Sequence, residues 1–537
     1  MHDFLIIGSG FGGSVSALRL AEKGYTVAVL EAGVRYRAED FPRTNWNLFK
    51  FLWAPALRCF GIQRITLLSD VLILSGTGVG GGSLVYANTL LTPPAPFYQD
   101  PQWAGMDDWE ARLAPHYATA KRMLGAVRNE KMTPADRVLK EVADAAGCGH
   151  TFRMQDVGVF FGEPEVTVPD PYFDGRGPDR TGCRHCGGCM VGCRHDAKNT
   201  LDKNYLHLAE GLGVEIFPET TATLVRPTTD GYAVETRRTT AWLPGGRRIF
   251  EARRVIFSGG VLGTLPLLFR CREAGTLPHL SPMLGARVRT NSETLTGATA
   301  RRGDVDYSEG VAITSSIYPD EVTHVEPVRY PAGSDVMNLL TTPLTDPAPR
   351  FRRVFKWMGN LLRHPLDSLR VLWPFGWAKR TVILLVMQTL DNSIRVFQRR
   401  RWWWPFTKSL VSEPEQARAR VPVTVPQAQP ITRLLAEKMN GIPQSAINEV
   451  LLNTGITAHI LGGCVIGPDP SQGVVDGQGR VFGYEGLYVA DGSIIPANLG
   501  VNPSLTITAL TEHLMDRIPP KDADREPDDQ PRGFRTM

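Results

Sequence analysis

The sequence has no long hydrophobic run and no marked excess of charge of either sign. Its longest strongly apolar stretch, VILLVM at 382–387, is far shorter than the roughly 20 residues that a membrane-spanning helix needs. The 59 basic and 55 acidic side chains leave a formal net charge of +4, so the overall charge selects no class of partner. We therefore expect neither a membrane-spanning protein nor one whose binding is driven by total charge.

A secretory signal is also missing. The first predicted strand begins within MHDFLIIGSG, which leaves no room for a charged segment, an apolar segment and a cleavage site. We therefore expect a cytoplasmic protein, whose cysteines are thiols or metal ligands rather than disulfides. With 42% hydrophobic and 21% charged residues over 537 positions, the chain is typical of a folded protein with two domains.

The stretch at 3–33, DFLIIGSGFGGSVSALRLAEKGYTVAVLEAG, predicts a strand, a glycine turn, an amphipathic helix, and a second strand that ends in an acid. Gly8 permits a tight turn, Gly10 lets the backbone approach a pyrophosphate, and Gly13 allows close packing of helix and strand. Glu31 is placed to accept hydrogen bonds from a ribose. An acid here favours NAD or FAD over NADP.

A second glycine segment, SGTGVGGGSLVYANT, occupies residues 75–89. Four glycines in five positions would let the backbone lie directly against a flat ring or a phosphate, although a flexible loop has the same composition. The expected cofactor contacts here are Gly80, Gly81, Gly82, Ser83, Tyr86 and Asn88.

Two passages near the C-terminus contain further candidate cofactor-binding residues. GLYVADGS at 486–493 predicts a strand whose end brings Asp491 and Gly492 to the phosphate or ribitol region of the cofactor. NPSLTITALTEHL at 502–514 predicts a helix that begins at Asn502 and Pro503 and turns its N-terminus toward the cofactor. Ala222 is assigned to the same cofactor-binding set.

With SGGVLGTLPLLF at 258–269 and TAHILGGCVIG at 457–467, these motifs make the chain resemble the glucose–methanol–choline (GMC) oxidoreductases, and within them the cholesterol oxidases, from the N-terminus to about residue 513. The resemblance implies FAD and the oxidation of an alcohol CH–OH group by hydride transfer to flavin N5. It implies a hydrophobic, sterol-like substrate, with electrons passing to oxygen or another acceptor. No histidine occurs at 75–92, so we expect FAD to be bound non-covalently.

The same resemblance places His459 and Asn502 beside the substrate carbon and the flavin. His459 is then either a general base for the hydroxyl proton or a group that orients the alcohol through a hydrogen bond. The amide of Asn502 donates to the substrate oxygen or the flavin, and a helix cap is its alternative role.

Two positions depart from the cholesterol oxidases. PAGSDVMNLL at 331–340 resembles the stretch that bears their active-site glutamate, and Asp335 takes its place as a third catalytic candidate. Because Asp335 is one methylene shorter, isomerase activity is doubtful, and simple surface exposure is the alternative. Tyr86 stands where those oxidases have an asparagine, which weakens the expectation that oxygen is the acceptor.

The stretch CRHCGGCMVGC at 183–193 holds four of the eight cysteines, namely Cys183, Cys186, Cys189 and Cys193. Their spacing is that of a bacterial ferredoxin run, but the proline that normally follows is replaced by Arg194 and there is no second run. Zinc, with His185 and His195 nearby, is another interpretation, and reduced thiols in a glycine-rich turn are a third. A membrane-associated flavin and iron–sulfur electron carrier is accordingly the alternative function.

Between Arg350 and Lys408 the chain holds 13 Lys or Arg, two Asp and six of its 11 tryptophans. The segment FKWMGNLLRHPLDSLRVLW at 355–373 has helical periodicity with apolar and basic faces, which suits the surface of an anionic membrane. The alternative is a packed helix followed by a pair of strands. Nucleic acid is not expected as a partner, because most of this insert should be core.

These observations predict an α/β protein with a discontinuous Rossmann-like FAD-binding domain and a second, substrate-binding α+β domain. We expect the FAD-binding domain at 1–100, 200–295 and 455–515, and the substrate domain at 101–199 and 296–454 with a mixed or antiparallel sheet. The charged, proline-rich tail at 516–537 should be disordered. The sequence does not predict the oligomeric state.

Overall fold

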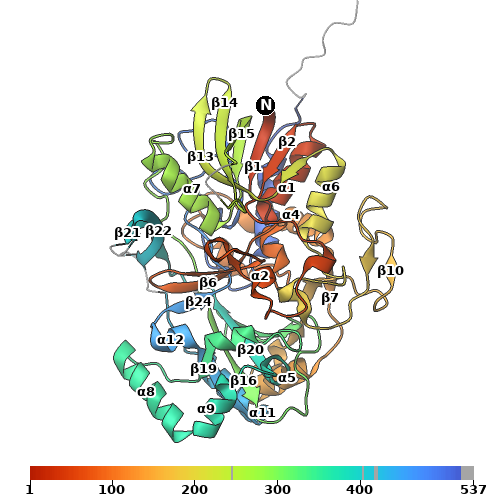
Figure 1. The fold of residues 1–537 in the computed structure, drawn as a ribbon, viewed down its shortest axis with the longest axis vertical. Helices are drawn as coiled ribbons and strands as arrows, with labels where there is room; N and C mark the ends of the chain where they lie inside the picture. The colour runs from red at the N-terminus through yellow and green to blue at the C-terminus, as the bar shows by residue number, and fades with distance from the viewer. Residues whose placement is uncertain (243–245, 402–403, 416–420, 522–537) are drawn as a thin grey trace, which may run out of the picture.

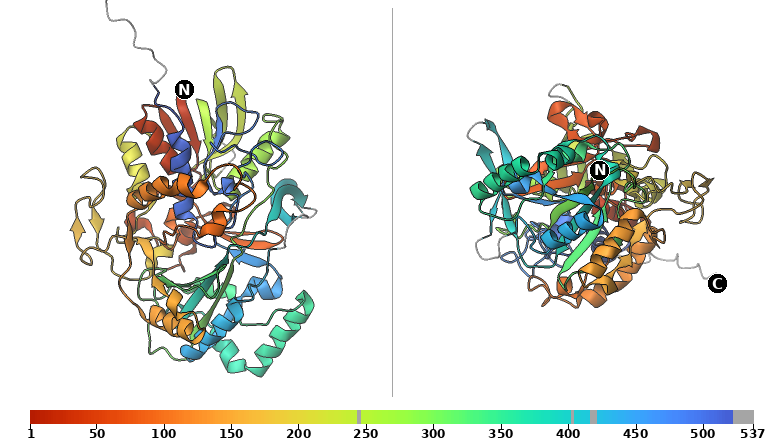
Figure 2. Two further views of the ribbon diagram at one scale, coloured as in Figure 1. Left: turned by 180° about the vertical axis from the view of Figure 1, so that it is seen from behind. Right: turned by 90° about the horizontal axis from the view of Figure 1, so that it is seen from below.

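The computed structural model describes residues 1–242, 246–401, 404–415 and 421–521 (Figure 1). Two main sheets form its upper and lower parts, and a smaller sheet lies between them in the view of Figure 1. Among the described residues, no helix combines the length and the apolar character that crossing a bilayer requires. The structure places the N-terminus and the last described residues at the same end of the molecule (Figures 1 and 2).

The upper sheet has seven strands in the order β12-β2-β1-β15-β14-β13, with β25 paired to β15. Its parallel part joins the first strand to strands that lie far along the chain, which confirms a discontinuous Rossmann-like domain. The strands are β1 (His2–Ile7), β2 (Val27–Leu30), β12 (Glu215–Phe217), β13 (Thr220–Thr228), β14 (Gly231–Arg238), β15 (Arg248–Phe257) and β25 (Leu487–Val489).

Helices cover this sheet and bury its apolar side chains. The first helix packs against both α6 and the last helix, which in turn packs against α4, while α7 lies on β13. Strands of continuous apolar sequence such as FLII and VAVL are buried on both faces, as parallel strands between helices require. The helices are α1 (Phe11–Glu22), α4 (Trp109–Met123), α6 (Tyr205–Gly211), α7 (Val261–Glu273) and α13 (Ser504–Asp516).

The lower sheet has five strands in the order β18-β20-β16-β23-β19, and every pair is antiparallel. This sheet confirms a second, α+β part of the fold. Helices α5 (Pro134–Ala145) and α11 (Ala428–Lys438) cover one region of it. The strands are β16 (Thr294–Ala300), β18 (Thr323–Val328), β19 (Thr341–Pro343), β20 (Thr381–Gln388) and β23 (Gly441–Ala446).

A three-stranded sheet between the two parts places the two most informative motifs side by side. It consists of β5 (Gln63–Leu67), β6 (Val71–Gly76) and β24 (Gly455–Thr457). Strand β6 leads into the second glycine segment and β24 leads into His459, and these two strands are parallel. Because the carboxyl ends of parallel strands point the same way, the glycine segment and His459 emerge on one side of this sheet.

The basic aromatic insert folds into α8 (Arg350–Arg363), α9 (Pro365–Leu372), α10 (Trp377–Arg380), β20, and a hairpin of β21 (Ile394–Arg401) and β22 (Trp404–Pro414). The prediction that most of it is core is wrong for α8 and α9, because large apolar side chains there are exposed. Residues 402–403 of the RRRWWWPF stretch lie outside the described residues.

The remaining short elements lie mainly in the connections. They are α2 (Leu48–Phe51), α3 (Ala95–Tyr98), α12 (Ile447–Leu451), β3 (Trp53–Ala54), β4 (Cys59–Phe60), β7 (Ala126–Arg128), β8 (Arg153–Met154), β9 (Asp156–Gly158), β10 (Thr167–Val168), β11 (Arg180–Thr181) and β17 (Ser315–Ser316).

The start of the predicted tail is anchored on the upper sheet. Lys521 Nζ donates to Asp3 Oδ2 at 2.6 Å, and its backbone N–H donates to the carbonyl of Lys23 at 3.0 Å. Residues 516–521 therefore do not follow the predicted disorder, and the rest of that tail, 522–537, lies outside the described residues.

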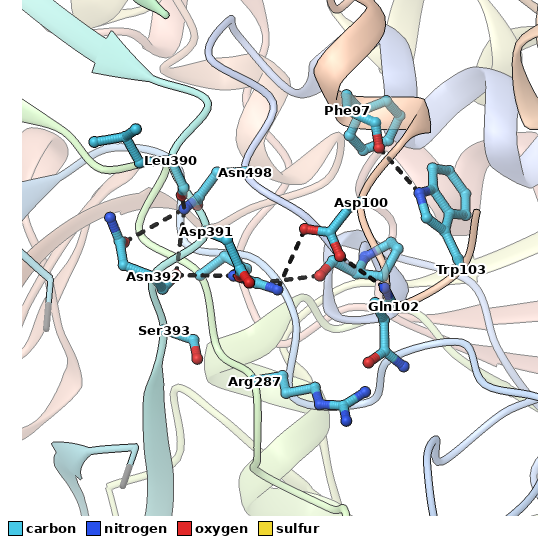
Figure 3. A network of polar contacts seen from close by, with 12 residues as sticks. Phe97, Asp100, Gln102, Trp103, Arg287, Leu390, Asp391, Asn392, Ser393 and Asn498 are labelled. Atoms are coloured by element: carbon cyan, nitrogen blue, oxygen red, sulfur yellow. Dashed lines mark hydrogen bonds and ion pairs between the residues drawn. The ribbon is translucent and has the colours of Figure 1, made fainter. Parts of the chain in front are cut away.

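A buried polar network holds the loop that precedes Asn502 (Figure 3). The guanidinium of Arg289 is fully buried, donates through Nε to the carbonyl of Pro496 at 3.1 Å, and pairs with Asp391. Asn498 Nδ2 donates to the carbonyl of Leu390 at 2.6 Å. These bonds join segments from distant parts of the chain, so they fix the position of the loop.

Candidate active site

A cavity of about 1280 Å³ runs between the upper and lower parts of the fold. Both glycine segments, the start of α7 and the loop after β25 contribute to its wall. His459 and Asn502 line the same cavity. The structure thus brings together motifs that are more than 400 residues apart in the sequence.

The first glycine turn has the close contacts that its sequence predicts. Gly8 has a φ of 109°, in the left-handed region that favours glycine. A Cβ on Gly13 would lie 2.0 Å from the carbonyl oxygen of Gly8, whereas a Cβ on Gly10 would meet nothing within 4 Å. Gly8 and Gly10 line the cavity. The backbone at Gly10 is therefore open to a ligand at the N-terminus of α1.

Glu31 lies at the cavity wall, but its carboxylate is engaged within the loop. Oε2 accepts hydrogen bonds from Ser9 N at 3.1 Å and Ser9 Oγ at 2.7 Å, and Oε1 accepts one from Gly33 N at 2.8 Å. Burial raises the pKa of Glu31, and these hydrogen bonds oppose the rise. The contact between Glu31 and a ribose stays a prediction.

The second glycine segment packs directly on the first. Gly80 and Gly81 have φ values of 100° and 52°, and a Cβ on Gly81 would lie 2.7 Å from Gly10 Cα. Gly81 and Gly82 line the cavity. Ser83 is buried and donates its hydroxyl to the carbonyl of Gly80 at 2.7 Å, so it stabilises the loop.

Tyr86 and Asn88 follow this loop. Tyr86 lines the cavity, and its hydroxyl donates to the carbonyl of Asn199 at 2.7 Å. Asn88 is buried with a φ of 71°, and its amide has no hydrogen-bond partner among the described residues. Asn88 is absent from the cavity wall, so its contact with the cofactor stays a prediction.

The loop after β25 contributes the other predicted contacts. Asp491 is buried and accepts hydrogen bonds from Gly260 N at 2.8 Å and Thr264 Oγ1 at 2.6 Å, so it ties the start of α7 to this loop. Burial raises the pKa of Asp491. The cavity wall also includes Ala222, Gly492 and Pro503.

His459 is oriented by a buried glutamate that the sequence analysis missed. Its Nδ1 lies 2.8 Å from Glu293 Oε2, and Glu293 also accepts hydrogen bonds from Ala458 N at 2.9 Å and Thr457 Oγ1 at 3.1 Å. With a carboxylate on Nδ1, the neutral ring carries its proton there, so Nε2 has a free lone pair.

Asn502 contacts a second buried glutamate. Its Nδ2 donates to Glu326 Oε2 at 3.1 Å, while Asn502 Oδ1 and Glu326 Oε1 have no hydrogen-bond partner among the described residues. Burial and, to a lesser degree, the charge of Glu293 raise the pKa of Glu326 to about 8. Helix α13 begins at Ser504 with Pro503 as its N-cap, so the helix-cap role of Asn502 is wrong.

A signal for these two glutamates was present in the sequence. Glu293 and Glu326 each stand next to or inside an otherwise uncharged stretch, SETLTGATA at 292–300 and THVEPV at 323–328. A single acid in a strand whose other positions are apolar or small is expected to be buried and paired. What the sequence does not give is the partner, because Glu293 and His459 are 166 residues apart.

Asp335 occupies a different kind of place. It is only 3% exposed, so the alternative of surface exposure is wrong. Its two carboxylate oxygens accept hydrogen bonds from Gly376 N at 3.0 Å and Ala378 N at 2.8 Å, at the start of α10. Asp335 is absent from the cavity wall, and its carboxylate acts within the fold as a cap.

The four clustered cysteines, Cys183, Cys186, Cys189 and Cys193, line a smaller cavity of about 460 Å³. Burial raises the pKa of Cys189 to about 11. Among the described residues, no group of three or more His, Cys, Asp or Glu side chains is placed to hold a metal ion. The zinc and iron–sulfur interpretations therefore have no support here, and the iron–sulfur electron carrier is not favoured.

Comparison with known proteins identifies the family. Residues 176–289 and 394–511 match models of the GMC oxidoreductases, and residues 6–43 match that of the NAD(P)-binding Rossmann-like domain. A cholesterol oxidase of Acinetobacter baumannii is 49% identical over 97% of this chain and 95% of its own length. The chain belongs to the GMC oxidoreductase family. It is an FAD-dependent enzyme of the alcohol-oxidising type.

Two further comparisons support this assignment. A cholesterol oxidase of Mycobacterium tuberculosis is 51% identical over 98% of this chain and 93% of its own length. The solved structure of pyridoxine 4-oxidase from Mesorbium loti has a TM-score of 0.61 at 15% identity, and the match covers 96% of this chain and 98% of that one. The second likeness is one of fold alone.

The cavity fits an FAD molecule on three observations. The backbone at Gly10 is open, the two glycine loops expose backbone without side chains, and the amide oxygen of Asn502 is buried without a partner among the described residues. The residues that would hold FAD are Gly8, Gly10, Gly81 and Gly82 of the two glycine loops, with Glu31 and Asp491, all of which line the cavity. Gly13, Gly80, Ser83 and Asn88 are absent from its wall.

Proposed function

We propose that this enzyme oxidises the hydroxyl group of a sterol-like alcohol. The observation that carries the proposal is a set of apolar side chains that line the same cavity as the glycine loops, His459 and Asn502. This set comes from the lower sheet and the neighbouring 3₁₀ helix at Val336–Leu340, and includes Leu295, Ile313, Val328, Met337, Ile383 and Leu385. A large hydrophobic body is held by such a surface, while two polar groups fix its hydroxyl. The relatives named as cholesterol oxidases favour the same class of substrate.

His459 has the geometry of a general base. In the proposed reaction, its Nε2 accepts the hydroxyl proton, and the carboxylate of Glu293 stabilises the imidazolium that results. Because Glu293 also bonds the backbone at Ala458, it holds the ring in one orientation before substrate arrives.

Asn502 positions the substrate oxygen from a second direction. Its Nδ2 carries two protons, of which one is donated to Glu326, so the other can be donated to the substrate oxygen. At neutral pH Glu326 is largely the neutral acid, because its pKa is about 8.

FAD, when bound, accepts the hydride from the carbinol carbon. We propose that it is bound non-covalently, because no histidine occurs at 75–92. The test is acid precipitation of the purified protein, after which the yellow colour should stay in the supernatant. Colour that stays with the pellet would overturn non-covalent binding.

Isomerisation is no part of the proposal. Asp335, the expected base for a proton shuttle between two carbons, is engaged at the start of α10 and absent from the cavity wall. Oxidation of a 3-hydroxy sterol should therefore give a ketone whose double bond has not moved, which mass and ultraviolet spectra of the product would test.

The decisive experiment is anaerobic mixing of the flavin-loaded enzyme with sterols and with short hydrophilic alcohols, while flavin absorbance is followed. Sterols should bleach the flavin and short alcohols should not. Bleaching by short alcohols alone would overturn the assignment of the substrate class. Admission of oxygen afterwards, with assay for hydrogen peroxide, distinguishes oxygen from another acceptor.

A further inference from the structure

The outer side of α8 and α9 is apolar and exposed. On α8, Phe351, Phe355 and Leu362 are 79%, 70% and 81% exposed. Their positions follow a helical spacing of four to seven residues, so they lie on one side of the helix. We name as the apolar face the exposed side chains Phe351, Phe355, Met358, Leu362, Leu366, Leu369 and Trp373.

The opposite side of α8 packs against the protein and is partly polar. Arg353 is buried and pairs with Glu449 at 3.3 Å, and Trp357 Nε1 donates to Thr342 Oγ1 at 2.7 Å. A helix on a water-soluble surface usually has the reverse arrangement, with its apolar side inward. The two helices lie at the end of the molecule opposite the N-terminus (Figures 1 and 2). The packing thus turns the apolar face away from the protein.

Positive charge surrounds this face. Residues 350–366 contain no Asp or Glu, and Arg352, Lys356 and Arg363 are exposed beside the apolar side chains. None of these three forms an ion pair with an acid among the residues that the structure describes. An apolar helix face bordered by free cations matches the chemistry of an anionic bilayer surface, where side chains enter the acyl region and cations meet phosphates.

We propose that the apolar face docks the enzyme on an anionic membrane, with α8 and α9 lying in the interface. The occupant is a lipid surface rather than a second copy of this chain, because two copies would bring the cations of both faces together without acids to pair them. The helices do not span the bilayer, since α8 has 14 residues and α9 has eight.

The docking surface lies beside the wall of the cavity. Helix α9 packs on the 3₁₀ helix Val336–Leu340, of which Met337 and Leu340 line the cavity and Leu339 is 59% exposed. This link rests on the proposed function, because it gives docking a purpose only if the substrate is dissolved in the membrane. A sterol-like alcohol would then reach the cavity without crossing water.

The test is co-sedimentation of the flavin-loaded enzyme with vesicles of phosphatidylcholine, with and without phosphatidylserine. The wild-type enzyme should bind the mixed vesicles, more weakly at high salt, and hardly bind phosphatidylcholine alone. The double variant Phe355→Gln, Leu362→Gln should bind the mixed vesicles roughly 100-fold more weakly. The double variant Arg352→Glu, Lys356→Glu should bind them about ten-fold more weakly or less well still. The matched control is Leu212→Gln with Ile249→Gln, which are 54% and 55% exposed on the upper part of the fold and should leave binding unchanged.

Vesicle binding is read without substrate, so it is independent of the proposed reaction. Flavin bleaching by a detergent-solubilised sterol should be the same in the wild-type enzyme and in all variants, and its absence in every protein would count against the function alone. Vesicle binding that survives both double variants, or that falls equally in the control, would overturn docking. So would a wild-type dimer in analytical ultracentrifugation that the Phe355→Gln, Leu362→Gln variant converts to a monomer.

Discussion

Two buried glutamates stand on the two sides of the active site, and their surroundings differ. Glu293, just before β16, accepts hydrogen bonds from Thr457, Ala458 and His459. Glu326, on β18, receives one from Asn502, and its other oxygen has no partner among the described residues. Glu293 thus has three polar partners, whereas Glu326 has one hydrogen-bond donor among the described residues.

This difference is reflected in the raised pKa of Glu326. Donors around a buried carboxylate favour its anion, whereas burial without donors favours the neutral acid. The nearby His324 does not replace those donors, because its Nε2 lies 3.9 Å from Glu326 Oε1, beyond hydrogen-bond distance, and burial lowers its pKa to about 3. Glu326, behind the group that only orients substrate, therefore keeps its proton up to a higher pH than an ordinary glutamate, whereas Glu293 stands behind the group that takes up a proton.

Removal of the imidazole should have the largest effect. In His459→Ala the proposed acceptor of the hydroxyl proton is lost, so the rate of flavin reduction should fall by about 10²–10⁴-fold. Stopped-flow absorbance under anaerobic conditions measures this rate. An unchanged rate would remove His459 from the chemistry and make this a flavin-binding protein without the proposed reaction.

Glu293→Gln should have the next largest effect. Glutamine keeps the size of the side chain but loses the charge that stabilises the imidazolium, so flavin reduction should slow by about 10–100-fold. The loss should be much smaller in a His459→Ala background, because the two residues act as a unit. Equal losses in both backgrounds would mean that Glu293 does not act through His459.

Glu326→Gln should change flavin reduction little at pH 7 and alter the dependence on pH. Folding raises the pKa of Glu326 from 4.5 to about 8. The contribution of Glu326 to the free energy of unfolding is therefore fully present below pH 4.5 and is lost as the pH rises through 8. A shift of this size amounts to at most about 5 kcal/mol. Chemical denaturation of the wild-type enzyme should show stability falling between these two pH values.

In the Glu326→Gln variant that fall should be smaller. An apparent pKa near 8 in the rate profile of the wild-type enzyme should also be absent from the variant. Glu326→Ala serves as a comparison, because it removes the contact to Asn502 as well. If stability and rate depended on pH in the same way in the wild-type enzyme and in Glu326→Gln, the raised pKa of Glu326 would be wrong.

The sequence predicts the parts of this site that are local in the chain. The βαβ unit follows from spacing within the first 33 residues, as does the close approach of Gly13 to Gly8. The packing of Gly8 against Ser258 does not follow from spacing, because these residues are far apart in the sequence. His459 and Asn502 came from resemblance to a family. Glu293 and Glu326 were missed, because a buried acid is interpretable only through its partner, and the partners lie 166 and 176 residues away.

The cysteine run illustrates the opposite error. Its spacing at 183–193 suggests a cluster, but spacing does not report whether four thiols converge on one point. In the described part of the chain they border a cavity without forming a metal-binding group. In the basic aromatic insert, periodicity correctly predicted helix α8. The side of α8 that faces the protein depends on the ion pair between Arg353 and Glu449, and no local sequence pattern reveals that pair.

Asp335 is a third buried acid, and its variant should have the smallest effect on the reaction. Asp335→Asn keeps one acceptor for Gly376 and Ala378 but loses the charge at the start of α10. Stability should fall by about 1 kcal/mol, measured by chemical denaturation, while flavin reduction stays within about two-fold of wild type. A large loss of rate with unchanged stability would instead give Asp335 a role in the reaction. Hydrogen bonds from backbone N–H groups to a buried acid would then not be enough to identify that acid as structural.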